Sequence, residues 1–159
     1  MTPSIANGLL RRFSELPAAR PLLARLDEVE GVYLVGGAVR DLLLQAEPLD
    51  LDLVIDGELQ SVAALLGPPE RVHDRFETRT MSLEGFTYDL ARARRETYAH
   101  PGALPTVAPA GIEEDLRRRD FTVNALALGL SGTGRGRLLG VPHGLQDVEA
   151  RRLRVLHDR

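Results

Sequence analysis

Two aspartates separated by one residue carry the clearest chemical signal in this sequence. Asp50 and Asp52 stand in the run LDLDLVI, where polar and apolar residues alternate. Side chains alternate between the two faces of a β-strand, so a strand over residues 50–55 puts both carboxylates on one face. Two carboxylates that close repel each other unless a cation lies between them. Because Mg²⁺ binds one or two carboxylates together with substrate phosphates, this pattern predicts a magnesium site.

A pair of glycines lies upstream of these aspartates. Gly36 and Gly37 end the apolar run Val32–Val35 and precede residues 38–44, which can form two helical turns. Glycines let a phosphate approach the backbone closely, and the start of a helix offers free N–H groups and a positive dipole end. Either feature alone is commonly just a turn or a solvated strand end. Together they predict a phosphate site beside a metal site.

The arrangement of apolar strand, glycine pair and alternating aspartates resembles the nucleotidyltransferase superfamily typified by polymerase β. The longer string GGAVRDLLL…LDLDLVIDG is similar, more narrowly, to class II tRNA nucleotidyltransferases and bacterial poly(A) polymerases. This resemblance implies an α/β (α+β) head domain with a small mixed β-sheet and helices mainly on one face. It also implies template-independent nucleotidyl transfer from CTP or ATP to a tRNA 3′-hydroxyl. Two Mg²⁺ ions held by Asp50 and Asp52 would drive the reaction.

Further residues match the family around this centre. Asp89 stands between apolar neighbours in TYDLA, where the superfamily can carry a third catalytic acid; a charge on an edge strand is the alternative. Arg40 matches the position that would hold a triphosphate oxygen. Asp41 would contribute to the same nucleotide site or pair with an arginine to fix the helix. A surface ion pair of little energetic value is the plain alternative for these two residues.

Three adjacent arginines open a second block, RRRDFTVNA, at residues 117–125. Successive helical residues are rotated by about 100°, so the three arginines cannot share one face, and an inward arginine needs an anion. Asp120 suits the N-cap of a helix over residues 121–130. The block resembles the family motif RRDFTxNA, which implies that Arg119, Asp120 and Asn124 contact the nucleotide and order the site. A solvated basic helix with an aspartate cap is the alternative.

The segment Arg92–Gly111 is predicted to be a long polar loop, since it holds three prolines. Loops of this length without regular structure are uncommon and usually functional or mobile. The segment is similar to the flexible-loop region of bacterial members of the family. That similarity implies a role in the switch between C and A, with Arg92 contacting phosphate or primer.

Hydrophobic spacing and turn residues predict the remaining elements. Helices are expected at Ser4–Leu16, Leu22–Glu30, Glu58–Leu66, Ile112–Arg119 and Gly144–Ala150. Strands are expected at Arg79–Leu83, Phe86–Ala91, Arg137–Gly140 and Leu153–Leu156, with a tight turn at Glu84-Gly85.

Composition excludes several classes of protein. The chain has no cysteine, so disulfide frameworks and thiolate metal sites are excluded, and its four histidines show no metal-ligand spacing. All 20 basic residues are arginine, so any cationic side chain on a phosphate must be a guanidinium. The net charge of −3 argues against a general nucleic-acid coat. No apolar run approaches a membrane span or a signal-peptide core, which makes a cytoplasmic protein the expectation.

The 159 residues are expected to form one nucleotidyltransferase head domain, residues 1–159. In the resembled family the head is followed by a helical neck that reads the base, and by helices that hold the tRNA. The sequence shows no match to these parts. It therefore leaves CCA, CC-only, A-only and poly(A) addition open. The alternatives are a poly(A) polymerase head, or a non-catalytic nucleotide- or metal-binding module that needs a partner chain. A small antitoxin-like nucleotidyltransferase is a weaker alternative, because such domains lack an RRDFT block.

Overall fold

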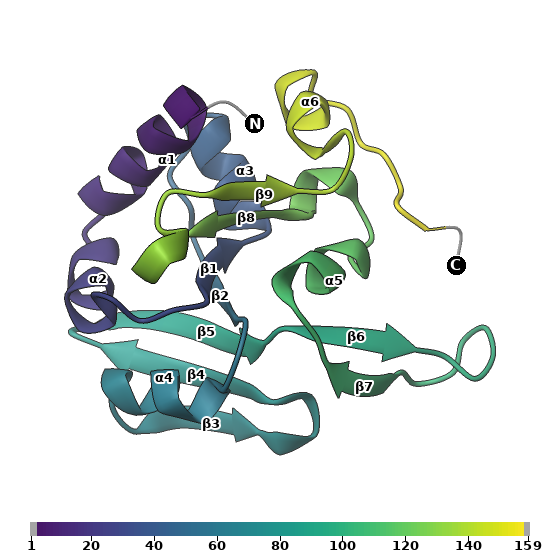
Figure 1. The fold of residues 1–159 in the computed structure, drawn as a ribbon, viewed down its shortest axis with the longest axis horizontal. Coiled ribbons are helices and arrows are strands. Elements are labelled where there is room, and N and C mark those ends of the chain that lie inside the picture. The colour runs from purple at the N-terminus through teal and green to yellow at the C-terminus, as the bar shows by residue number, and fades with distance from the viewer. Residues whose placement is uncertain (1–2, 158–159) are drawn as a thin grey trace.

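A seven-stranded sheet with the order β3-β4-β5-β2-β1-β8-β9 runs through the computed structural model, which describes residues 3–157 (Figure 1). Only β2 and β5 pair in parallel, so the sheet is mixed, as predicted. Its strands are β1 (Val32–Val35), β2 (Leu51–Ile55), β3 (Pro69–His73), β4 (Thr78–Leu83), β5 (Phe86–Arg92), β8 (Leu126–Gly129) and β9 (Leu138–Gly140).

Helices cover mainly one face of this sheet, as the resemblance implied. The larger hydrophobic core lies on that face and includes residues from the first four helices. These are α1 (Pro3–Glu15), α2 (Ala19–Leu26), α3 (Gly37–Leu43) and α4 (Leu59–Leu66). A smaller core lies on the opposite face under α5 (Ile112–Arg117), and α6 (Gly144–Glu149) packs near the end of the described chain (Figure 1). Short 3₁₀ turns occupy Asp74–Phe76, Thr122–Asn124 and Gly132–Gly134. Within residues 3–157, each helix is too short or too polar to cross a lipid bilayer.

The side chains of β2 alternate between the two faces of the sheet, and this alternation keeps the carboxylate of Asp52 out of the larger core. Leu51, Leu53 and Ile55 pack into the larger core, while Val54 belongs to the smaller core on the other face. Asp52 is exposed on that second face. The apolar residues therefore fix the rotation of the strand, and the aspartate is presented on the face that carries fewer helices.

The predicted helix over residues 121–130 is wrong. The chain forms a 3₁₀ turn at Thr122–Asn124 and then strand β8, which pairs with β1 on one side and β9 on the other. A continuous apolar run fits a strand buried on both faces as well as a helix, and periodicity alone cannot separate the two. The predicted N-cap role of Asp120 is wrong for the same reason. Its carbonyl instead accepts a hydrogen bond from the backbone N–H of Leu156.

The predicted loop Arg92–Gly111 is also wrong. It contains strands β6 (Arg94–Thr97) and β7 (Thr106–Pro109), which pair as a separate antiparallel hairpin that extends from the domain (Figure 1). Proline is tolerated on edge strands and at strand ends, and in a two-stranded hairpin both strands are edges. The prolines therefore did not exclude strands here.

Two other strand assignments differ at the edges of the fold. The predicted strand Leu153–Leu156 is reduced to one isolated bridge between Phe121 and Val155. Strand β3 was not predicted, because every residue in it is exposed and it shows no apolar alternation. The turn at Glu84-Gly85 is confirmed, and both residues have positive φ (50° and 86°), as a two-residue hairpin turn requires.

Candidate active site

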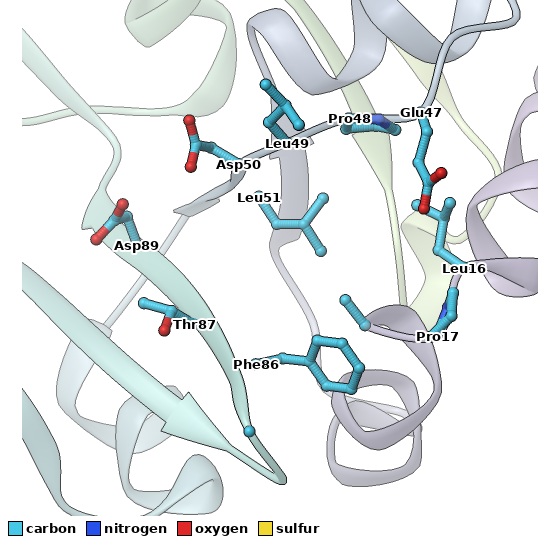
Figure 2. Close-up of a pocket in the computed structure, with 12 residues that line it drawn as sticks. Leu16, Pro17, Glu47, Pro48, Leu49, Asp50, Leu51, Phe86, Thr87 and Asp89 are labelled. Carbon is cyan, nitrogen blue, oxygen red and sulfur yellow. The ribbon is translucent and has the colours of Figure 1, made fainter.

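Three aspartates lie at the junction of strands β2 and β5. Asp52 and Asp89 are direct partners in the parallel register of these strands. Asp50 immediately precedes β2. Figure 2 shows the carboxylates of Asp50 and Asp89 turned to the same side, with Leu51 and Phe86 on the other. The structure therefore brings together the three acids that the sequence singled out.

A cleft of about 370 Å³ opens over this part of the sheet. Asp52 and Asp89 line it from the strands, and Arg118 and Arg119 line it from the segment after α5. A neighbouring pocket of about 310 Å³ is lined by Asp50 and Asp89 together with apolar residues (Figure 2). Asp89 thus forms part of the wall of both cavities.

Negative charge accumulates in this cleft. The pKa of Asp52 is raised, first by partial desolvation in the cleft, although the residue stays exposed, and then by the charges of Asp89 and Asp50, whereas Arg119 acts in the opposite direction. Like charges side by side favour an added cation. In the part of the chain that the structure describes, no group of three or more His, Cys, Asp or Glu side chains could hold a metal ion. Asp52 and Asp89 offer two carboxylates side by side, and Mg²⁺ is an ion that can complete such a shell with water and substrate phosphates.

The glycine bend lies beside Arg119, one of the residues that line the cleft. Gly36 has φ +69°, and a Cβ atom there would lie 3.4 Å from Nη1 of Arg119, which lines the cleft. A Cβ atom at Gly37 would lie 3.2 Å from Nη2 of Arg40. The missing side chains therefore leave room for two guanidinium groups. The amide of Gly36 itself donates to the carbonyl of Leu126, so this N–H is engaged within the fold.

Arg40 joins the two sequence blocks. Its Nη1 donates to Oδ1 of Asn124 at 2.8 Å, which links α3 to the 3₁₀ turn. Its Nε and Nη2 donate to Oδ1 of Asp41 at 3.2 and 3.1 Å. The structure therefore brings Arg40, Asp41 and Asn124 together beside the bend, with Asp41 in the arginine-pairing role that the sequence left open.

Asp115 holds the inward arginines in place. Its side chain is fully buried and accepts from Nε of Arg118 at 3.2 Å and Nη2 of Arg119 at 3.0 Å. It also accepts from the backbone N–H of Arg94 at 3.0 Å, which ties the start of β6 to α5. The sequence predicted an anion for the inward arginines but did not show which residue supplies it. The signal was the spacing, since residues at i, i+3 and i+4 share a helix face.

The other arginine contacts extend this arrangement. Glu96 on β6 accepts from Arg94 at 3.0 Å and from Arg118 at 3.2 Å. Burial raises the pKa of Glu96, but the hydrogen bond from Tyr98 and the two arginine charges lower it overall. Arg117 is exposed, with Glu113 at 3.9 Å. Of the three adjacent arginines, two turn inward and one outward, as the helical rotation predicted.

A second buried carboxylate fixes the RRDFT block and was not predicted. Asp147 on α6 accepts from Oγ1 of Thr122 at 2.7 Å and from Nε of Arg154 at 3.0 Å. The hydrogen bond from Thr122 is the main cause of its lowered pKa. These contacts hold the 3₁₀ turn that carries Asn124.

Of the sequence-predicted site residues, Asp52, Asp89 and Arg119 line the cleft. Arg92 and Asp120 line neither the cleft nor the neighbouring pocket. Arg92 pairs with Glu77 at 3.5 Å and lines a small cavity of about 110 Å³ next to the β6–β7 hairpin. The side chain of Asp120 is exposed.

Comparison with known proteins places this geometry in a family. The family model described as the poly(A) polymerase head domain matches residues 32–154. The chain belongs to this head-domain family. The match begins at β1 and includes the aspartates, the glycine bend and both inward arginines.

Relatives of this head domain are tRNA nucleotidyltransferases. A CC-adding tRNA nucleotidyltransferase from Deinococcus radiodurans is 50% identical over 131 residues, which are 79% of this chain and 35% of the relative. An A-adding tRNA nucleotidyltransferase from Halalkalibacterium halodurans is 40% identical over 148 residues, which are 87% of this chain and 35% of the relative. The chain thus spans about a third of the length of these relatives.

Solved structures share the fold of the head domain. The Thermotoga maritima CCA-adding enzyme, solved in complex with tRNA, superposes with a TM-score of 0.76 at 30% identity. The likeness covers 96% of this chain and 36% of that enzyme. The polymerase-β-like head with a mixed sheet is therefore confirmed.

Proposed function

We propose that this head domain transfers nucleotides from CTP or ATP to the 3′-hydroxyl of tRNA. One observation carries the proposal: Asp52 and Asp89 stand directly opposite each other on parallel strands, in a cleft whose other wall is Arg119 at the glycine bend. Carboxylates for a metal ion and a guanidinium for phosphate thus share one cavity. The activities for which the relatives are named, CC addition and A addition to tRNA, support the same reaction class.

Each residue has a role in this reaction. Asp50 and Asp52, with Asp89, would hold Mg²⁺. When bound, Mg²⁺ makes the attacking hydroxyl a better nucleophile and neutralises charge on the leaving pyrophosphate. The triphosphate would lie against the bend at Gly36 and Gly37, where Arg40 and Arg119 place positive charge.

The remaining candidates act around the nucleotide. Asn124 orients Arg40 through their 2.8 Å hydrogen bond, and Asp41 fixes the same guanidinium. Asp120 and Arg92 remain predictions from the family motif, with contacts to ribose and to primer respectively. Most of these groups position charge, which is the main contribution of a protein to phosphoryl transfer.

The test is nucleotide incorporation by the chain with Mg²⁺. Three tRNA substrates, ending at the discriminator base, after the first C and after the second C, are incubated with labelled CTP, labelled ATP or both. CTP incorporation on the first two alone indicates CC addition, and ATP incorporation on the third alone indicates A addition. Incorporation on all three indicates CCA addition, and repeated ATP addition indicates a poly(A) polymerase.

A substitution tests the metal role directly. Asp52→Ala is expected to lower incorporation by at least about a hundredfold, because it removes stabilisation of the charge that develops at the reacting phosphate. Glu70→Ala on the exposed strand β3 removes a carboxylate away from the cleft and should retain the full rate. An Asp52→Ala variant as fast as the parent would refute the proposed metal role. If the parent transfers nothing, calorimetry with CTP and Mg²⁺ decides between a non-catalytic binding module and no nucleotide site.

A further inference from the structure

A threonine on β4 supports the candidate metal site from its outer side. Oγ1 of Thr80 donates a hydrogen bond to Oδ1 of Asp89, with 2.8 Å between the oxygens. Thr80 and Asp89 are direct partners in the antiparallel register of β4 and β5. Asp89 and Asp52 are direct partners in the parallel register of β5 and β2. Hydroxyl and carboxylates therefore form one lateral row across three adjacent strands.

The strand fixes the direction of this hydroxyl. Met81, the next residue on β4, is fully buried in the larger core, so Thr80 must point to the opposite face. Thr80 lines the same cleft as Asp52 and Asp89. A β-branched side chain also has restricted rotation about χ1. The hydroxyl is therefore held on the face where the carboxylates lie.

We propose that Thr80 is a positioning residue that orients the carboxylate of Asp89 for a divalent cation shared with Asp52. This proposal rests on the proposed function and deepens it. A carboxylate that ligates a metal is typically held by a hydrogen bond from a second group, which fixes its orientation before the ion arrives. With Oδ1 engaged by Thr80, Asp89 presents Oδ2 to the cation.

A purely structural role predicts a different result. Cross-strand pairs between polar side chains stabilise sheets whether or not a metal binds. Such a role would lower the melting temperature of Thr80→Val and leave its cation affinity unchanged. Cation affinity is therefore the property that separates the two roles.

The experiment measures Mn²⁺ binding to the full chain by electron paramagnetic resonance, with thermal unfolding to check that each variant is folded. Thr80→Val keeps the shape and removes the hydroxyl, and it should weaken Mn²⁺ binding by at least about tenfold. Thr80→Ser restores the hydroxyl and should bind within about threefold of the parent, a change of less than about 0.7 kcal/mol. Ser82→Ala is the matched control, since it removes a hydroxyl from an exposed site on the same strand and face.

A double variant tests whether Thr80 affects Mn²⁺ binding through Asp89. If Thr80 acts through Asp89, then Thr80→Val should add no further loss of Mn²⁺ affinity to Asp89→Asn, because coupled residues are non-additive. Parent-like affinity in folded Thr80→Val would overturn the proposal, as would an equal loss in the presence and absence of Asp89. A parent chain that binds no Mn²⁺ would instead overturn the proposed function itself.

Discussion

Two groups of charges lie against the same cleft and are built in opposite ways. Around Asp115, each inward arginine has a carboxylate within 3.2 Å, and the aspartate is fully buried. Across the sheet, Asp52 and Asp89 stand side by side with like charge, and Asp52 is exposed. The charges around Asp115 compensate one another inside the protein. The strands that carry Asp52 and Asp89 do not supply an equal positive charge beside these two carboxylates.

The difference shows which group holds shape and which is available for chemistry. Ion pairs with buried partners and several hydrogen bonds fix a local arrangement, and breaking one is costly because a charge is left unpaired. Adjacent like charges in a cleft perturb a pKa and are typical of functional sites. The Asp115 group therefore positions Arg119, and the aspartate row is where we propose that a cation binds.

Removing Asp115 from the compensated group is expected to have the largest effect on stability. Asp115→Ala removes three hydrogen bonds and leaves two largely buried arginines without their shared anion. The free energy of unfolding should fall by about 3–5 kcal/mol in urea denaturation. Glu113→Ala on the same helix is the matched control, because its pair with Arg117 is 3.9 Å long and exposed, and it should cost under about 0.5 kcal/mol. Equal costs for the two variants would contradict the distinction.

Displacing the arginine from the bend is expected to have an intermediate effect. Gly36→Ala forces a side chain into a positive-φ conformation, 3.4 Å from Nη1 of Arg119. It should lower the free energy of unfolding by about 1–3 kcal/mol and weaken CTP binding measured by calorimetry. Gly8→Ala in α1 is the control, since a Cβ atom there meets nothing within 4 Å. Helix propensity favours alanine at that position by up to about 1 kcal/mol. A Gly36→Ala variant with parent-like stability and affinity would contradict the role of the bend.

Neutralising one member of the like-charge row is expected to have the smallest effect on stability, with the opposite sign. Because the pKa of Asp52 is raised in the folded chain, its charge opposes folding at pH values above that raised pKa. Asp52→Asn should therefore be more stable than the parent at pH 7, by less than about 1 kcal/mol since the side chain is exposed. As pH falls through the raised pKa towards the ordinary aspartate value, the parent carboxylate becomes protonated and the difference should vanish.

Adding Mg²⁺ gives a second test of the row of aspartates. A ligand that binds only the folded state stabilises it, so Mg²⁺ should raise the melting temperature of the parent at pH 7. Asp52→Asn should lose much of this response, while Glu70→Gln on β3 should keep it. A response to Mg²⁺ that is the same in Asp52→Asn and the parent would argue against a cation between the carboxylates.

The sequence predicted the centre of the fold well, because β1, α3 and β2 each carry a strong local signal. The alternation of aspartate and leucine at residues 50–53 favours a strand with one polar face, and Gly36 adopts the positive φ that ends β1. The errors fall where local signals are ambiguous. Strand β8 is apolar throughout because both of its faces are buried, and the β6–β7 hairpin carries prolines because both strands are edges.

The candidate site likewise contains some residues that the sequence predicted and others that it did not. Residue type and spacing selected Asp50 and Asp52, since a strand presents every second side chain on one face whatever surrounds it, whereas Asp89 was selected by its match to the family pattern. The sequence also required an anion for the inward arginines without showing which residue supplied it. Asp147 was missed because Thr122 comes from a distant position in the chain, and Arg154 lies beyond the end of the helix that carries Asp147.

By itself, then, the sequence determined the chemistry of the functional groups, because side-chain type and strand period are local properties. The tertiary structure decided which groups meet. The register of β5 with β2 set Asp89 beside Asp52, and the pairing of β4 with β5 brought Thr80 to the same row. Packing of α5 against the second face placed Arg119 at the glycine bend. The contacts of Asp52 with Asp89 and of Arg119 with the bend join residues that are far apart in the chain, so only the folded arrangement of strands and helices fixes them. Thr80 and Asp89 are nearer in sequence, since they face each other across the Glu84-Gly85 hairpin.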